Sequence, residues 1–188
     1  MITSTVCVVP EKPLEPSEPA DLANLVIDSL KFAAEGQSVT GSIALSGMLR
    51  LADVLLNHAG SLNCALSGFE ERRFGTVKLG LHLRISGRLT LHCQRCLAEV
   101  VHACVVDSRL LLIPPGEAWP EEEVEADDYD ALPADRALSV LALVEDEVLL
   151  ALPIVPRHAD CQLPADAGSG EESDSRLPFA ALAGLKKH

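Results

Sequence analysis

The sequence predicts an α+β domain in which an antiparallel β-sheet, barrel-like or strongly curved, packs against two or three helices between flexible N- and C-terminal arms. Three observations predict this fold class. In the middle of the chain, apolar and polar residues alternate over long stretches, as along a half-buried strand. On both sides of this region, apolar residues recur at helical spacing. Hydrophobic residues make up 48% of the 188 residues and aromatic residues only 3%, so the core must be aliphatic.

The chain length fits one core-bearing domain with tails. Residues 1–20 contain four prolines and several acids, which predicts an extended N-terminal arm. Residues 21–163 are predicted to form the single α+β domain, with an acidic loop inserted at 116–135. A polar linker at 164–176 then leads to a short apolar and basic segment at 177–188.

Two helices are predicted before the main sheet. Residues 20–36 carry apolar side chains at helical spacing, and Gly36 is suited to end this helix. A second helix is predicted over residues 46–60, where Gly60 can cap the last turn. A short strand, residues 39–45, lies between them.

The strands are predicted from alternation. Residues 77–85 read as a half-buried antiparallel strand whose outer side is polar and partly basic. Ser86-Gly87 is predicted to turn the chain into a return strand that ends at Cys93. A further strand covers residues 100–113 and stops at two prolines. An earlier strand is indicated by the alternating residues Leu62, Cys64 and Leu66.

A third helix is predicted after the acidic loop, over residues 138–153. Ser139 is a suitable N-cap, and Pro153 ends the helix. The residues expected on its buried side are Leu141, Ala142, Val148, Leu149 and Leu152. A turn-rich strap follows from Ile154.

The negative charge is unevenly distributed. The formal net charge is −13, and residues 117–147 hold twelve acids against one base, whereas residues 70–109 hold seven bases against four acids. Nucleic acids bind proteins through phosphate neutralisation by Lys and Arg, so the chain as a whole repels RNA. Direct RNA contact is therefore expected only at a local basic patch, with Arg84, Arg88 and Arg95 as candidates.

The acidic run has two interpretations. It is either a solvated loop or a surface for a basic protein partner. The same alternatives apply to Glu145, Asp146 and Glu147 in the third helix, which are candidate partner-binding residues or simply a solvated face. Three consecutive acids point in three directions on a helix, so a cation site there is less favoured.

Two close pairs of potential metal ligands stand out. Cys93-x-x-Cys96 lies at a predicted strand end, and His158-x-x-Cys161 lies on the strap. Together they offer the Cys3His set of a structural zinc site, in which short loops aim paired ligands at one ion. The alternative is that a single CxxC arises by chance and the second pair is unrelated. The lone cysteines Cys7, Cys64 and Cys104 are most simply small core or surface residues.

Several function classes are excluded by motif. A redox CxxC begins a helix after a strand, whereas this one runs from strand to strand. The chain has no GxSxG, no HExxH and no glycine-rich phosphate loop, which argues against an enzyme and a small-molecule substrate. No apolar run approaches the ~18 residues of a membrane span. The N-terminus lacks a secretory signal, so a cytoplasmic location with reduced or metal-bound thiols is expected.

Three separated blocks resemble one bacterial family. They are "CQRCL" at 93–97, "LALVEDEVLLALPIVPRH" at 141–158 followed by a Cys, and "PFAALAGLKK" at 178–187. Their order and spacing are similar to the YceD-like family, the large ribosomal RNA subunit accumulation proteins. "GMLRLADVLL" at 47–56 resembles the N-terminal part of the proteobacterial branch. Because both ligand pairs lie in signature blocks, the resemblance strengthens the zinc hypothesis.

The resemblance implies a non-enzymatic role in synthesis, processing or stability of 23S rRNA. Given the acidic charge, the expected partner is a basic ribosomal protein or a large-subunit precursor, with RNA contact limited or indirect. In the C-terminal block, Phe179, Leu182 and Leu185 would share one side of a short helix, and Lys186 and Lys187 would lie at its end, as a further partner-binding set. The alternative function is a zinc-knuckle interaction module unconnected with ribosomes.

Overall fold

The computed structural model describes residues 22–73, 76–118 and 129–161. In chain order its elements are η1 (Leu22–Asn24), β1 (Val26–Ile27), α1 (Ser29–Ala34), β2 (Ser38–Ala44), η2 (Leu45–Gly47), α2 (Leu49–Ala52), β3 (Ser61–Arg73), β4 (Thr76–His92), β5 (Glu99–Ile113), β6 (Asp130–Pro133), β7 (Leu138–Ser139) and α3 (Val140–Ala151). The predicted N-terminal arm, linker and C-terminal segment lie outside the described residues, as do residues 119–128 of the acidic loop.

The main sheet has five strands in the order β2-β3-β4-β5-β6. Neighbouring strands from β2 to β5 are antiparallel, whereas β6 pairs with β5 in parallel. β1 and β7 form a separate two-stranded sheet. The α+β class is therefore confirmed. The main sheet has two open edges, β2 and β6, so it is not a closed barrel.

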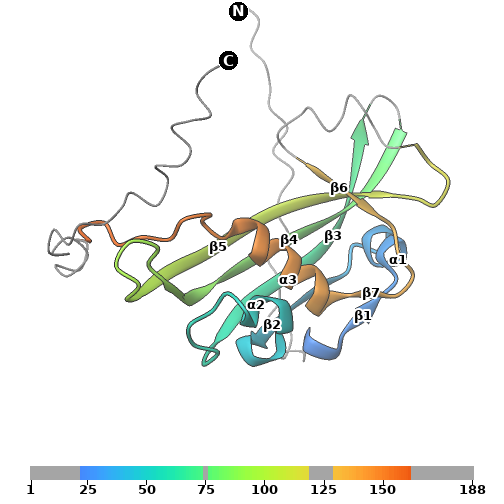
Figure 1. Cartoon of the computed structure of the whole chain (residues 1–188). Coiled ribbons are helices and arrows are strands. Elements are labelled where there is room, and N and C mark those ends of the chain that lie inside the picture. Colours follow the sequence, from blue (N-terminus) through green and yellow to red (C-terminus); the bar gives the residue numbers. More distant parts are fainter. Residues whose placement is uncertain (1–21, 74–75, 119–128, 162–188) are drawn as a thin grey trace, which may run out of the picture.

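Helices lie on one face of the main sheet (Figure 1). α1 contacts β3 and β4, α3 contacts β4 and β5, and α2 packs against α3. The core between these layers is aliphatic, as composition predicts. Its fully buried side chains include Leu22, Ile43, Leu45, Met48, Leu51, Leu62, Leu66, Leu81, Leu83, Leu89, Leu91 and Val140. None of the helices in the described ranges is long and apolar enough to cross a membrane.

The first two predicted helices are shorter than expected. Among the described residues 22–36 only Ser29–Ala34 is α-helical, because the Asp28 side chain caps it there and Val26–Ile27 pairs with β7 instead. Within residues 46–60 only Leu49–Ala52 is α-helical. In both segments, tertiary pairing overrides an apolar spacing that is compatible with a longer helix.

The predicted turn at Ser86-Gly87 is wrong. β4 runs without a break through both residues, and Gly87 pairs with Cys104 of β5. Gly87 is favoured by a close approach, because an added Cβ would lie 2.4 Å from Leu62 Cδ2 and 3.3 Å from the Ser61 carbonyl oxygen. Glycine inside a strand commonly marks such an approach.

The predicted loop at 116–135 is only partly a loop. Its last residues form β6, in which Leu132 pairs with Leu112 of β5. Immediately before β6, Tyr129 packs against Phe69, with ring centroids 6.1 Å apart. Near the start of the predicted loop, Lys78 Nζ donates to Glu117 Oε1 at 3.1 Å. Both ends of the predicted loop therefore contribute to the fold.

The third helix begins where predicted. The Ser139 hydroxyl accepts a hydrogen bond from the Ala142 backbone N–H at 3.3 Å, as an N-cap does. The buried face differs from the predicted one. Of the five residues expected to be buried, only Val148 is fully buried. The buried positions are Val140, Leu143, Val144, Glu145 and Val148. Apolar residues surround this helix almost completely, so spacing alone does not define its inner side.

Replacing Gly68 with Ala is expected to destabilise the domain by about 1–3 kcal/mol, a typical cost of overpacking. α1 lies directly on β3 at this point, and an added Cβ would be 2.5 Å from Ala33 Cα and 2.6 Å from the Phe32 carbonyl oxygen. Both are backbone atoms, so α1 would have to move. Urea unfolding measures the loss. Gly47→Ala is the matched control, because nothing lies within 4 Å of its added Cβ; equal stability of the two variants would contradict the prediction.

Candidate metal centre

A tight turn between β4 and β5 presents two cysteines. The turn closes with hydrogen bonds from Cys93 N to Ala98 O at 2.8 Å and from Leu97 N to Cys93 O at 2.9 Å. Leu97 adopts a left-handed conformation, with φ of 61°. This geometry places Cys96 one turn beyond Cys93, so that two short loop positions present sulfur to the same side.

The strap after α3 folds back onto this turn. The chain leaves α3 at Pro153, and Gln94 N then donates to Pro156 O at 2.8 Å. Further along the strap, Arg95 Nη1 donates to Cys161 O at 2.7 Å. These two bonds hold the strap beside the turn, although some sixty residues separate the strap from the turn in the sequence.

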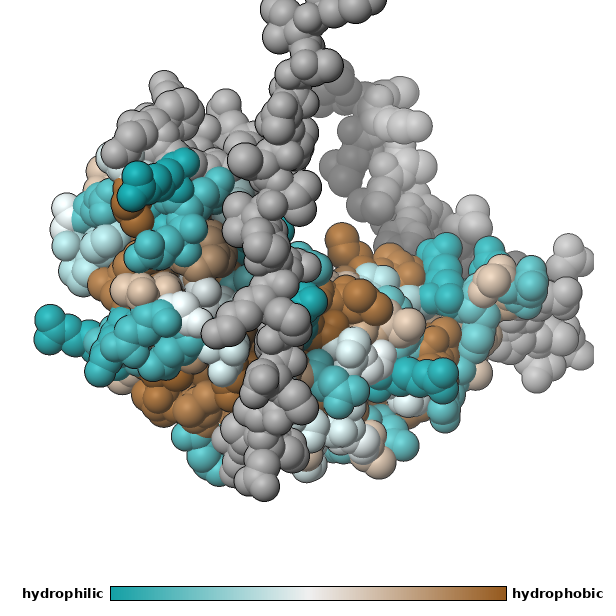
Figure 2. All heavy atoms as spheres, turned by 180° about the vertical axis from the view of Figure 1, so that it is seen from behind, coloured by the Kyte–Doolittle hydropathy of each residue, from teal (hydrophilic) through white to brown (hydrophobic). Residues whose placement is uncertain are grey.

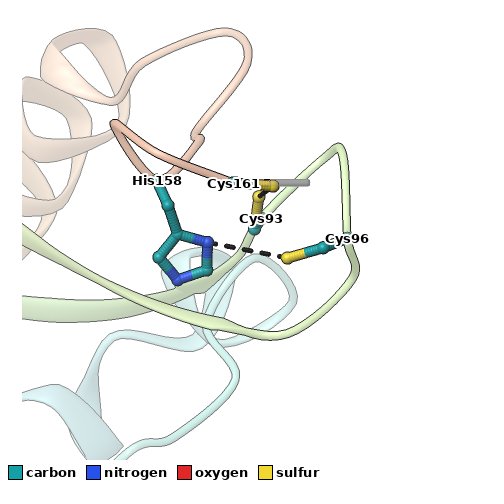
Figure 3. Close-up of side chains that lie close together, drawn as sticks. All are labelled: Cys93, Cys96, His158 and Cys161. Carbon is teal, nitrogen blue, oxygen red and sulfur yellow. Dashed lines mark hydrogen bonds between the residues drawn. The ribbon is translucent and has the colours of Figure 1, made fainter. Parts of the chain in front are cut away.

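The strap brings the second ligand pair to the first (Figure 3). Cys93 Sγ lies 3.6 Å from Cys161 Sγ, and Cys96 Sγ lies 3.6 Å from His158 Nδ1. All four ligand atoms lie within 4.8 Å of one another. In a tetrahedral zinc site, Zn–S distances of about 2.3 Å and Zn–N distances of about 2.0–2.1 Å separate neighbouring ligand atoms by about 3.5–3.8 Å. The spacing fits such an ion.

His158 is oriented as a ligand. Its Nε2 lies 2.7 Å from the Glu99 carbonyl oxygen, which can only accept a hydrogen bond, so Nε2 carries the proton. The Nδ1 lone pair is then free to face Cys96 and a metal. A carbonyl that fixes the tautomer from behind is the usual support of a zinc-bound histidine.

The local charge favours a cation. The Cys96 backbone N–H, assisted by the Arg95 and His158 backbones, outweighs desolvation and lowers the pKa of Cys93 to about 5. Burial, followed by hydrogen bonds to Cys96 and Cys93, raises the pKa of Cys161 to about 11. The pKa of His158 is raised by its bond to Glu99 and by the two nearby thiols. The Cys93 thiolate therefore forms readily, whereas ionisation of Cys161 would require a bound cation.

The remaining described cysteines lie in the core, one of the two settings expected for them. Cys64 and Cys104 are buried and free. Burial raises the pKa of Cys64 to about 12 and also raises the pKa of Cys104. They are neutral thiols that fill space, away from the Cys3His cluster. Cys7 lies outside the described residues.

The three arginines proposed for RNA contact occupy two different settings. Arg84 and Arg88 are exposed on the face of β4 that points away from the helices. Arg95 instead donates to Cys161 O, so its guanidinium helps to hold the strap. Arg95 lies between Cys93 and Cys96 in the sequence. That position does not show whether the arginine contacts RNA or holds the strap.

The three acids of α3 are not one solvated face. Glu145 is only 6% exposed. Its Oε1 accepts from the backbone N–H groups of Arg50 and Leu51 at 2.7 and 3.0 Å, and its Oε2 accepts from Arg50 Nε at 3.0 Å. Asp146 also binds the Arg50 guanidinium, and Glu147 accepts from the Ser108 hydroxyl. Glu145 is therefore a structural residue, which corrects its assignment to a partner surface.

The sequence offered no local signal for Arg50, because its partners lie about 95 residues away. The other predicted partner-binding residues, Phe179, Leu182, Leu185, Lys186 and Lys187, lie outside the described residues and stay a prediction.

A second feature that the sequence analysis missed is an apolar surface beside the cluster. Ile154 on the strap is 98% exposed, Leu150 at the end of α3 is 80% exposed, and Leu97 in the turn is 72% exposed. A groove of about 290 Å³ runs between the strap and the end of α2, and Ile154, Val54 and Asp53 line it. Isolated exposed apolar residues are common, but Ile154, the most exposed of the three, also lines this groove.

Comparisons with known proteins place these features in a family. Residues 81–186 match the family described as "Large ribosomal RNA subunit accumulation protein YceD", and this span contains all four residues of the cluster. A protein of that name from Haemophilus influenzae is 25% identical over 172 residues, which covers 87% of this chain and 95% of the relative. No solved structure matches. Since the matched span exceeds half of the chain, this protein belongs to the YceD family of large ribosomal RNA subunit accumulation proteins.

Proposed function

We propose that this protein is a non-enzymatic assembly factor that supports the accumulation of large-subunit ribosomal RNA in the cytoplasm. Membership of the YceD family and the name of its Haemophilus relative support the ribosomal role. The protein would act through a basic ribosomal protein or a large-subunit precursor, rather than by chemistry on RNA.

In this proposal the Cys3His cluster holds one structural zinc ion. Four protein ligands complete a tetrahedron and leave no position for water or substrate, which is the arrangement of structural rather than catalytic zinc. The ion would fasten the strap, which carries His158 and Cys161, to the turn that carries Cys93 and Cys96. Zinc would thereby set the position of every residue between Pro153 and Cys161.

The observation that carries the proposal is the exposure of Ile154. A branched apolar side chain that is 98% exposed on a fastened strap gains about 1.5–3 kcal/mol when a partner buries it. Asp53 lines the same groove, and the whole chain carries a net charge of −13. An apolar surface with acidic surroundings fits an apolar segment flanked by Lys or Arg, as a basic ribosomal protein offers.

Ile154→Asp is expected to abolish association with large-subunit precursors while leaving the melting temperature unchanged within about 1 °C. The change places a charge on the apolar surface but touches no buried atom. Sedimentation of the tagged protein from cell extracts measures its association with the precursors, and thermal unfolding measures stability.

Val77→Asp is the matched control, because Val77 is 52% exposed at the start of β4, far from the turn. It introduces the same charge and should sediment as the wild type does. If Ile154→Asp still sediments with precursors, the surface is not the contact. If the wild type never sediments with them and binds only non-ribosomal proteins, the alternative of a zinc-knuckle module outside ribosome assembly replaces the proposal.

A further inference from the structure

The main sheet has a second face that no described helix covers. At its centre Val105 of β5 is 75% exposed, and Val101 is 58% exposed. Viewed from this side, hydrophilic and intermediate residues spread over the face with apolar residues between them (Figure 2). A shallow cavity of about 590 Å³ lies across β2, β3, β4 and β5, and its lining includes Thr40, Ser42 and Asn63.

Hydrogen-bond donors follow one strand along this face. Every second residue of β4 points outward, and from position 82 to 92 these residues are His82, Arg84, Ser86, Arg88, Thr90 and His92. Each can donate a hydrogen bond, and none is acidic. The row is about 34 Å long at about 3.4 Å per residue. Hydroxyl and amide groups of β2 and β3 border the row on one side. On the other side, the acids Asp107 and Glu99 of β5 lie opposite Arg84 and His92, so the donors form a strip along β4.

The three arginines on this face are free of internal partners. In the described ranges, Arg84, Arg88 and Arg109 make no ion pair or hydrogen bond, whereas the Arg50 and Arg95 guanidinium groups are both engaged. The acid opposite Arg84 in register is Asp107, and it is bonded to His82 Nε2 at 2.6 Å. The free guanidinium groups are thus available to an anionic ligand.

We propose that this face binds the sugar–phosphate backbone of single-stranded RNA, an inference that rests on the proposed ribosomal function. Guanidinium groups pair with phosphate oxygens in bidentate fashion. Ser, Thr and Asn side chains supply bonds to phosphate and ribose, and a straight row of donors suits one extended strand. The cavity lining contains no aromatic ring, and Phe69 and Tyr129, which line a separate pocket with Arg109, pack against each other. Base stacking along the row is therefore minor, and little base preference arises.

The test is fluorescence anisotropy of a labelled 20-nucleotide oligouridylate with the full chain. Three phosphate contacts predict a slope of about −2 for log affinity against log salt, hence about a 20-fold loss between 50 and 200 mM salt. In Arg84→Gln/Arg88→Gln one contact remains, so the slope should fall to about −0.7 and the loss to about 3-fold. An oligoadenylate of equal length should bind equally, and a 20-base-pair RNA duplex more weakly.

Arg136→Gln/Arg157→Gln is the control, because both arginines are exposed outside this face and the net charge changes equally. It should keep the wild-type slope. The proposal would be overturned if the control lost as much salt dependence as Arg84→Gln/Arg88→Gln, or if that variant bound like the wild type. A preference for the RNA duplex would also overturn it. So would absence of wild-type binding at 50 mM salt. These outcomes leave the Ile154-dependent association with precursors untouched, so failure of this inference is distinguishable from failure of the proposed function.

Discussion

Replacing Cys93 with Ser is expected to release the proposed zinc ion and to lower the melting temperature by about 10 °C. The pKa of the Cys93 thiol is lowered to about 5, and a serine hydroxyl cannot replace a thiolate as a zinc ligand. Without the ion, the strap is held to the turn mainly by the Gln94–Pro156, Arg95–Cys161 and His158–Glu99 hydrogen bonds. Elemental analysis of untagged protein and thermal unfolding measure the two effects.

Chelation provides the control for this prediction. EDTA should lower the melting temperature of the wild type to that of Cys93→Ser and should not change the variant, while added zinc should raise only the wild type. Cys104→Ala, which alters a core thiol away from the cluster, should still bind one equivalent of zinc. One equivalent retained in Cys93→Ser, or a wild type that binds no zinc when zinc is in excess, would show that the cluster is not a metal site.

The composition of the Cys3His cluster could be predicted from the sequence, but its assembly could not. Each pair is a local feature, because two ligands three residues apart share one short loop. The meeting of the pairs depends on the path of the strap, which is set by contacts such as Gln94 N with Pro156 O. No spacing rule contains that contact. The exposure of Ile154 was also unpredictable, since the apolar segment "LPIV" is equally compatible with burial.

Long alternating strands were the most predictable part of the fold, and short elements were the least. β5 and the start of α3 lie where alternation and the Ser139 cap place them. α1 and α2 have only six and four residues, so their limits depend on tertiary bonds rather than on propensity. Gly87 illustrates the same limit, because glycine serves a turn and a close approach equally well and the sequence does not distinguish them.

Glu145→Gln is expected to destabilise the domain by about 2–4 kcal/mol at pH 7, which would lower the melting temperature by about 5–10 °C. The carboxylate joins α3 to α2 by accepting the backbone N–H groups of Arg50 and Leu51 and the Arg50 guanidinium. The glutamine amide keeps one acceptor oxygen, but its NH₂ group replaces the other and faces N–H groups whose hydrogen bonds the carboxylate accepted. A buried donor without a partner costs about 1–3 kcal/mol. Asp146→Asn is the matched control, because Asp146 is 53% exposed and its pair with Arg50 is worth at most about 1 kcal/mol.

The pH dependence of this difference provides a stricter test. Desolvation would raise the pKa of Glu145, but the hydrogen bonds from Leu51 N and from Arg50 outweigh it and hold the pKa below the usual value. The stabilisation is therefore complete above the unfolded-state pKa of about 4.3 and is lost as the pH falls through the lower folded-state value. Urea unfolding of wild type and Glu145→Gln should give a constant difference from pH 7 to about pH 5 and a shrinking one below about pH 4. A difference that grows on acidification, or one below about 0.5 kcal/mol at pH 7, would mean that the carboxylate does not hold α2 to α3.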